Sequence, residues 1–255
     1  AASDVYKRQQ YIWASGNSGF ALTGVGRNPQ EYPTVSIENG IDGSRAIKLE
    51  TKSTGQFGET VKMPIAAGNL FLGSFDVNNA VQKPLKATLF GLPFGKKPLK
   101  FKGYYKYVPG TQSFKAKDKN GNTVTISRQE DEGDIYAVLY EAAGLDGKVL
   151  DGNNVLTSKN IVALARVEVE KTDRYIEFET SFQYGERKEI SWPQFIYRDT
   201  SDDGTGKYLR FSEEKMKNYE YNLAVVFTSS KYGAYFAGSV GSTLCIDKVE
   251  IVCEK

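Results

Sequence analysis

Short segments in which apolar and polar residues alternate, separated by glycine, asparagine and aspartate, run along almost the whole chain. The clearest segment is 99–107, where Phe101, Tyr105 and Tyr107 fall on one face and lysines fall on the other. A period of two is typical of β-strands with one buried face. The dipeptide Asn120-Gly121 adds a hairpin turn signal. This pattern predicts an all-β protein.

The expected strands cover residues 46–52, 69–76, 99–107, 114–117, 122–126, 135–141, 161–170, 175–182, 221–229 and 242–252. A short helix is expected at 212–217, where Ser212 can act as the N-cap. Neither an internal repeat nor a long linker divides the chain, so we expect one domain over residues 10–255. Its expected fold class is a two-sheet antiparallel β-sandwich, jelly-roll-like. Residues 1–9 (AASDVYKRQ) lack the apolar segment of a signal peptide, and we expect a non-native or disordered leader there.

Composition limits the chemistry that is open to this chain. None of the 255 residues is histidine, which excludes Ser-His-Asp and Cys-His nucleophile systems and histidine-ligated zinc. Lys and Arg number 33 against 31 Asp and Glu, a net charge of +2, which argues against a nucleic-acid partner. No apolar run approaches the roughly 20 residues of a membrane span.

Several stretches carry a family resemblance: 13–21 (WASGNSGFA), 32–34 (YPT), 66–75 (AAGNLFLGSF), 83–88 (KPLKAT), 90–94 (FGLPF), 102–107 (KGYYKY), 134–141 (DIYAVLYE) and 241–244 (GSTL), the last leading to Asp247. The chain resembles the family called "putative carbohydrate metabolism domain", found in envelope proteins of gut bacteria. The resemblance covers nearly everything after residue 10. Cys245 departs from it, because an aromatic residue is more usual at this place in the last strand.

The resemblance implies a β-sandwich akin to carbohydrate-binding modules. It also implies an exported protein of the cell envelope or cell surface, with further domains in the parent protein and a lipid anchor on a missing N-terminus as one option. It implies no known activity, and it gives no catalytic residue to carry over.

Aromatic residues beside polar side chains are the candidates for a carbohydrate-binding site. The apolar C–H face of a pyranose packs on an aromatic plane, while its hydroxyls bond to amide, carboxylate or guanidinium groups. The candidates are Trp13, Tyr104, Trp192, Tyr232 and Tyr235. The alternative is that both tryptophans belong to the core or to a sheet edge, since most large aromatic residues are at least half buried.

Glycoside hydrolysis is the alternative chemistry, and it needs two carboxylates about 5 Å or about 6.5–9.5 Å apart across a cleft. The acidic candidates are Asp76, Glu141, Glu177 and the cluster Glu130, Asp131, Glu132 and Asp134. Asp76 and Glu141 end apolar strands, where partial burial raises the pKa of a carboxyl group. Neighbouring acids point to opposite faces of a strand, so solvated turn charges are the simpler interpretation and no catalytic residue is assigned.

Asp247 is the candidate metal ligand, because jelly-roll carbohydrate modules often hold a structural calcium ion near the last strand. Calcium needs six or more oxygen ligands, so a turn or bulge role for Asp247 stays open. The loop Asp202-Asp203-Gly204 is a weaker option, and no cofactor is required otherwise. A strip of lysines is a candidate surface for anionic polymers, or simply a solvated face: Lys96, Lys97, Lys100, Lys102 and Lys106.

These features predict a module that binds polysaccharide or oligosaccharide without catalysis, within an exported or surface-anchored carbohydrate-utilisation protein. A glycoside hydrolase with two carboxylates is the first alternative, and a purely structural or adhesive surface domain is the second. Exposed coplanar aromatic rings would favour binding, two carboxyl groups facing each other would favour the enzyme, and buried tryptophans would favour the structural role.

Overall fold

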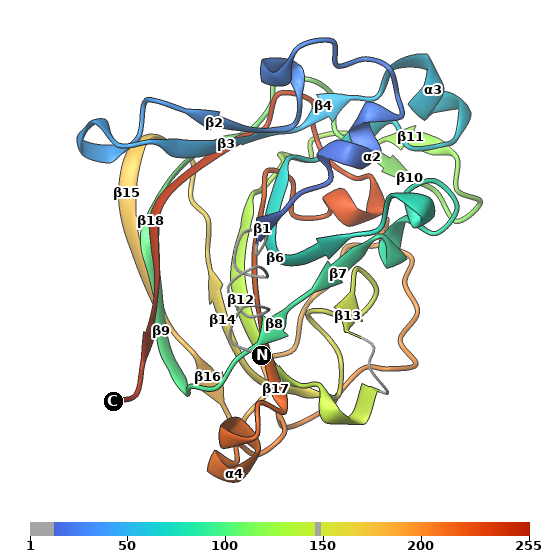
Figure 1. The fold of residues 1–255 in the computed structure, drawn as a ribbon. Coiled ribbons are helices and arrows are strands. Elements are labelled where there is room, and N and C mark those ends of the chain that lie inside the picture. The colour runs from blue at the N-terminus through green and yellow to red at the C-terminus, as the bar shows by residue number, and fades with distance from the viewer. Residues whose placement is uncertain (1–12, 146–148) are drawn as a thin grey trace.

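The computed structural model describes residues 13–145 and 149–255, so the predicted leader at residues 1–9 lies outside the described part (Figure 1). Two antiparallel sheets pack face to face. The large sheet has nine strands: β1 (Trp13–Ala14), β6 (Asn69–Phe75), β7 (Thr88–Phe90), β8 (Leu92–Pro93), β12 (Asp134–Glu141), β13 (Leu150–Asp151), β14 (Ile161–Val167), β16 (Gln183–Tyr184) and β17 (Tyr221–Thr228). Its main path runs β13-β7-β6-β17-β12-β14-β16.

The small sheet has five strands in the order β15 (Thr172–Ser181), β9 (Pro98–Val108), β18 (Thr243–Cys253), β3 (Ala46–Glu50) and β2 (Thr34–Ile37). Two further ribbons pair β4 (Lys52–Ser53) with β5 (Ile65–Ala66), and β10 (Lys115–Lys117) with β11 (Thr123–Thr125). The α-helices in the described ranges are short: α2 (Asn17–Ala21), α3 (Gly55–Thr60) and α4 (Glu213–Lys217). The predicted two-sheet antiparallel β-sandwich is confirmed.

The predicted elements correspond closely to the observed ones. The hairpin at Asn120-Gly121 joins β10 to β11, and the predicted helix is α4, whose cap Ser212 accepts a hydrogen bond from the backbone N–H of Lys215 at 3.3 Å. The single strand expected at 46–52 is broken, because Thr51 leaves the ladder between β3 and β4. The strands missed by periodicity are two to four residues long, too short to show an alternation.

The main core fills the space between the sheets. Phe101, Phe227 and Leu244 are fully buried there, on β9, β17 and β18. Gly103 also faces this core, and a Cβ at its position would lie 2.8 Å from the ring of Phe178. Glycine is therefore required at this position, because the ring of the neighbouring strand packs directly against the backbone.

The outer face of the large sheet is buried as well. Tyr136, Val138 and Tyr140 of β12 point away from the main core into a second apolar cluster, which also includes Val155 and Tyr208 from the connecting segments. A strand that is buried on both faces needs apolar residues at every position, which explains the unbroken apolar run in β12. Within the described ranges, no helix is long and apolar enough to cross a bilayer.

A buried polar network joins the two sheets at one end, and we call it the hydroxyl network: Thr51, Asp131, Ser229, Ser230 and Ser242. The Asp131 carboxylate accepts hydrogen bonds from Ser230 Oγ at 2.6 Å, Ser242 Oγ at 2.7 Å and the Ser239 backbone N–H at 2.7 Å. The Thr51 hydroxyl lies 2.6 Å from Ser230 Oγ and 2.8 Å from Ser229 Oγ. Residues that precede or follow β3, β12, β17 and β18 are thereby held together.

We predict that Asp131→Ala lowers the free energy of unfolding by about 3 kcal/mol, because several buried donors lose their acceptor at once. Urea unfolding followed by circular dichroism measures the change. Asp173→Ala is the matched control, since Asp173 is an exposed aspartate of β15, and a surface substitution should change stability by less than about 0.5 kcal/mol. Equal stability of the two variants would contradict the role of the network.

Candidate functional site

Four aromatic side chains from two distant segments form one group, which we call the aromatic cluster: Trp192, Phe195, Tyr232 and Tyr235. The Trp192 ring centroid lies 6.2 Å from that of Tyr232 and 6.0 Å from that of Tyr235, with interplanar angles of 53° and 73°. All four side chains are partly buried. The rings are tilted against each other, so they do not form the coplanar platform that would mark a flat sugar-binding face.

The two tyrosines are placed by a tight turn after β17. Tyr235 ends the 3-10 turn η7 (Gly233–Tyr235), and Phe236 leaves this turn in a left-handed conformation with φ of 56°. Gly233 is required at its start, because a Cβ there would lie 2.3 Å from the Cβ of Ala67. This close approach fixes η7 against the segment that leads into β6.

Trp192 is held by an arginine and its carboxylate partner. The Arg198 guanidinium lies 4.8 Å from the Trp192 ring centroid and donates hydrogen bonds to the Asp203 carboxylate at 2.5 and 2.6 Å. It also donates to Thr157 Oγ1 at 2.8 Å. The hydrogen bonds from Arg198 lower the pKa of Asp203 below its usual range. The arginine thus covers one face of the indole and is itself fixed.

A buried ion pair lies at the start of β12, beside the cluster. Arg166 Nε and Nη2 donate to the two Asp134 oxygens at 2.9 and 2.6 Å, and Asp134 is only 2% exposed. Burial opposes the charge of Arg166, but the attraction of Asp134 outweighs it, so the pKa of Arg166 is raised. Nearby, Lys231 pairs with Glu132 at 2.6 Å.

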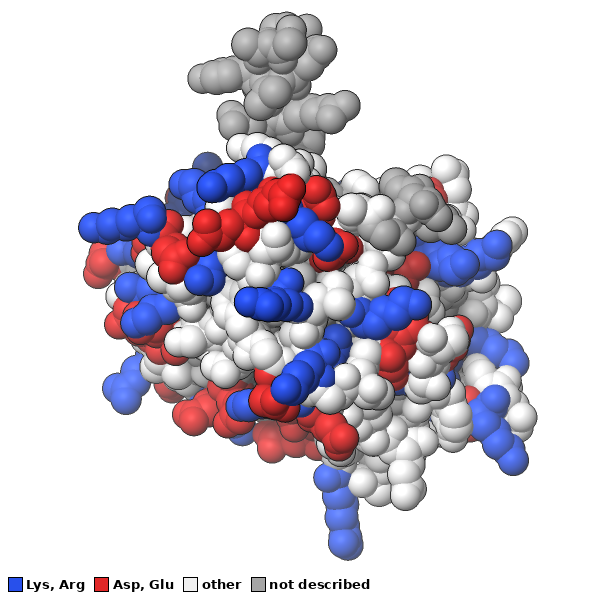
Figure 2. Space-filling model, turned by 90° about the horizontal axis from the view of Figure 1, so that it is seen from below, with Lys and Arg blue, Asp and Glu red and all other residues white. Residues whose placement is uncertain are grey.

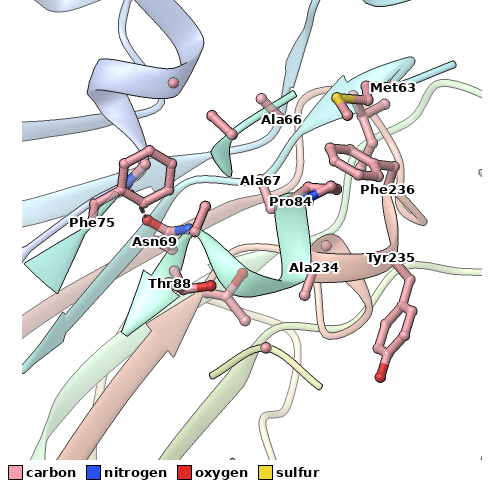
Figure 3. A pocket seen from close by; sticks show the side chains of 18 of the residues that line it. Met63, Ala66, Ala67, Asn69, Phe75, Pro84, Thr88, Ala234, Tyr235 and Phe236 are labelled. Carbon is pink, nitrogen blue, oxygen red and sulfur yellow. Dashed lines mark hydrogen bonds between the residues drawn. The ribbon is translucent and has the colours of Figure 1, made fainter. Parts of the chain in front are cut away.

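A cavity of about 190 Å³ lies next to the aromatic cluster, between the outer face of the large sheet and the helices α2 and α3. Trp192, Tyr235 and Asp134 line it. Figure 3 shows Ala234, Tyr235 and Phe236 on one side and Phe75, Asn69 and Thr88 on another. The cluster therefore borders a real hollow.

The structure brings together three of the five predicted carbohydrate-binding residues: Trp192, Tyr232 and Tyr235. Trp13 lies on β1 and packs on Phe227 at 6.1 Å, a residue of the main core, so it belongs to the opposite face of the large sheet. Tyr104 lies on the outer face of β9, because its neighbours Gly103 and Tyr105 are buried. These two residues are not part of the cluster.

Asp247, the predicted calcium ligand, makes hydrogen bonds within the protein. Its carboxylate accepts from the Ile41 backbone N–H at 2.8 Å, from the Lys248 backbone N–H at 2.7 Å and from the Ser44 hydroxyl. These contacts fix the turn η3 (Ile41–Gly43). Over the described residues, no group of three or more acidic, cysteine or histidine side chains is arranged around a metal position. A calcium ion at Asp247 stays a prediction.

The carboxylates weighed for hydrolysis make local contacts. Asp76 caps the turn η4 (Val77–Asn79), where it accepts from the Asn78 N–H at 3.0 Å, and Glu141 pairs with Lys215 at 2.7 Å. Asp203 of the other candidate metal loop pairs with Arg198, and its neighbour Asp202 accepts from Asn154 Nδ2 at 2.9 Å. The observed roles of these acids are structural.

Charges of both signs are interspersed on the surface seen in Figure 2. Lysines of the lysine strip also have acidic neighbours. Lys100 and Lys102 both pair with Glu179 of β15, and Lys97 pairs with Glu254 at 3.2 Å. Acidic partners therefore reduce the basic character predicted from the lysines alone.

Sequence reasoning named Asp203 only as part of a candidate metal loop, and it missed the Arg198–Asp203 and Asp134–Arg166 pairs. Arg198 was visible only as a polar neighbour of Trp192, six residues along the chain. The pairing of Asp134 with Arg166 depends on the register of β12 against β14, where Tyr136 lies opposite Arg166. No local sequence pattern specifies that register.

Comparison with known proteins places the chain among carbohydrate-related domains. A solved structure named as a putative glycoside hydrolase from Bacteroides thetaiotaomicron VPI-5482 is 43% identical with a TM-score of 0.79, over 95% of this chain. The chain spans only 63% of that protein. A second one, named as a putative glycoside hydrolase from Bacteroides vulgatus ATCC 8482, is 38% identical with a TM-score of 0.76, over 95% of this chain and 85% of that chain.

A family 11 carbohydrate-binding module from a cellulosomal cellulase of Clostridium thermocellum is 10% identical with a TM-score of 0.37, over 87% of this chain and 81% of that one. Among curated proteins, none matches. Residues 1–252 match the family described as "Putative carbohydrate metabolism domain". Because the match extends over nearly all of its 255 residues, the chain belongs to this family.

Proposed function

We propose that this domain binds glycan without catalysis at the aromatic cluster, as a module of a carbohydrate-utilisation protein. The convergence of Trp192, Tyr232 and Tyr235 at the border of the cavity carries the proposal. Partly exposed rings offer apolar faces and edges to the C–H surface of a sugar. An exported location stays a prediction of the family resemblance.

The tilt of the rings favours one kind of glycan. Coplanar rings suit the flat surface of a packed polysaccharide, whereas rings at 53° and 73° to each other suit one or two sugar units of a single chain. Polar partners stand beside the rings, with Arg198 at Trp192 and Lys231 at Tyr232. We therefore expect binding of soluble oligosaccharides or chain ends.

Glycoside hydrolysis is the second candidate, and two observations favour it. Both similar Bacteroides structures are named as putative glycoside hydrolases, and the carboxylate of Asp134 lies at the cavity. Against it, both Asp134 oxygens already accept hydrogen bonds from Arg166. A carboxylate bound in this way is poorly placed to give a proton to a leaving group.

We predict that Trp192→Ala weakens glycan binding by about 30-fold, or about 2 kcal/mol, as expected for a central aromatic contact. A glycan array first identifies a ligand, and affinity electrophoresis then compares the variants. Trp13→Ala is the matched control, because Trp13 lies on the other face of the large sheet. Equal losses in both variants would point away from the cluster.

An assay of released reducing sugar, made on the same glycans, distinguishes binding from hydrolysis. We expect binding without product. Release of product that is lost in Asp134→Asn, with the fold retained by circular dichroism, would replace the binding proposal by hydrolysis. Absence of both binding and product would favour a structural role.

We predict that glycan binding weakens at acid pH through Asp203. The pKa of this group is lowered in the folded protein by its hydrogen bonds to Arg198. The contribution of the ionised Asp203 to glycan binding is therefore fully present above a pH of about 3.9, the ordinary pKa of an aspartate. It is lost as the pH falls through the lowered pKa of the folded protein. The loss should be about fivefold, since a partly buried, solvent-screened ion pair of this kind contributes about 1 kcal/mol. Asp203→Asn should bind as the wild type does at low pH, and an identical pH profile in both would contradict the prediction.

A further inference from the structure

The cavity beside the aromatic cluster has a largely apolar wall. Its volume is about 190 Å³, whereas an engineered apolar cavity of about 150 Å³ is enough to bind benzene. Phe20, Phe71 and Phe90, all at least 94% buried, contribute to the wall. The space accommodates one substituted aromatic ring.

Most polar atoms of the wall already have partners inside the protein. Three threonines donate to backbone carbonyls: Thr23 to Phe20 at 2.7 Å, Thr54 to Met63 at 2.5 Å and Thr228 to Ser230 at 3.0 Å. Asn69 Oδ1 accepts from the Gly16 N–H at 2.7 Å, and Asp134 is occupied by Arg166. A sugar ring entering here would lose its hydrogen bonds to water and regain few of them, which disfavours it by several kcal/mol.

Among the described residues, two wall hydroxyls differ, those of Tyr136 and Thr88. Tyr136 lines the cavity and is only 6% exposed, and its hydroxyl has no hydrogen-bond partner among the described residues. The hydroxyl of Thr88, which also lines the cavity (Figure 3), likewise has none within the described ranges. Neither hydroxyl is among the described polar atoms that are sealed from solvent without a partner, so both are open to the cavity and can bond to a molecule that enters it. An otherwise apolar group with a single polar atom would match this wall.

The cavity also reaches the surface. Phe57 of α3 lines it and is 40% exposed, and Ala234 of η7 lines it and is exposed. The opening therefore lies between α3 and the turn that carries Tyr235 of the aromatic cluster. A group that enters the cavity and a glycan at the cluster can belong to one molecule.

We propose that the cavity binds a phenolic aryl group, carried as a substituent by the glycan that the aromatic cluster binds. The link to the glycan rests on the proposed function, whereas binding of the aryl group does not. The specificity of the domain would then be for aryl-substituted carbohydrate, with the ring in the cavity and the sugar outside.

The test uses p-cresol and toluene as probes on the 255-residue chain, followed by isothermal titration and by protein NMR. We expect p-cresol to bind at least tenfold more tightly than toluene. Tyr136→Phe should abolish that difference and leave toluene binding unchanged. Ala80→Leu, at a cavity-lining alanine, should weaken both probes at least tenfold, while Ala21→Leu, at an exposed alanine of α2 that is not part of the wall, should not.

Failure of both probes to bind at millimolar concentration would overturn the inference, as would binding that Ala80→Leu leaves intact. Equal affinity for p-cresol and toluene would overturn the phenolic assignment. The glycan array separates this result from the proposed function. If the protein binds glycan but neither probe, the cavity inference is wrong and the proposed function stands. Array glycans that bind equally well before and after alkaline removal of their ester-linked phenolic acyl groups would refute the link to the glycan.

Discussion

The buried carboxylate of Asp131 is the point on which both sheets depend. It draws together Ser230, which follows β17 of the large sheet, and Ser242, which precedes β18 of the small sheet. Between these two serines runs the segment that carries η7 and the tyrosines of the aromatic cluster. The same buried carboxylate therefore joins the two sheets and fixes both ends of the segment that carries the candidate site. Loss of these hydrogen bonds would disturb the fold and the site together.

Sequence periodicity predicted the long strands and the fold class because their cause is local. A strand with one buried face must alternate, as β9 does, and a strand buried on both faces has an unbroken apolar interior, as β12 has between Asp134 and Glu141. The short strands and the break at Thr51 could not be predicted from sequence periodicity. They depend on partners far along the chain, such as the serines that follow β17.

The candidate site was predictable only in part. Trp192, Tyr232 and Tyr235 were recognised by residue type, but the same criterion also selected Trp13 and Tyr104, which lie on other faces. Residue type reports what a side chain can bind, whereas the turn at Gly233 and the guanidinium of Arg198 decide where a ring lies. The cavity has no sequence signature, because its wall is assembled from α2, α3, η7 and several strands.

The position of β18 has a consequence for the order in which the chain folds. This strand is the last in sequence, yet it lies in the middle of the small sheet, between β9 and β3. During synthesis β3 and β9 leave the ribosome long before their shared neighbour exists, so their ladders with β18 cannot form, although β3 can pair with β2 and β9 with β15. The two sheets cannot pack completely until β18 has been synthesised, so the apolar inner faces stay exposed to water until then. Such non-local pairing slows folding and lengthens the time in which nascent chains are exposed to aggregation.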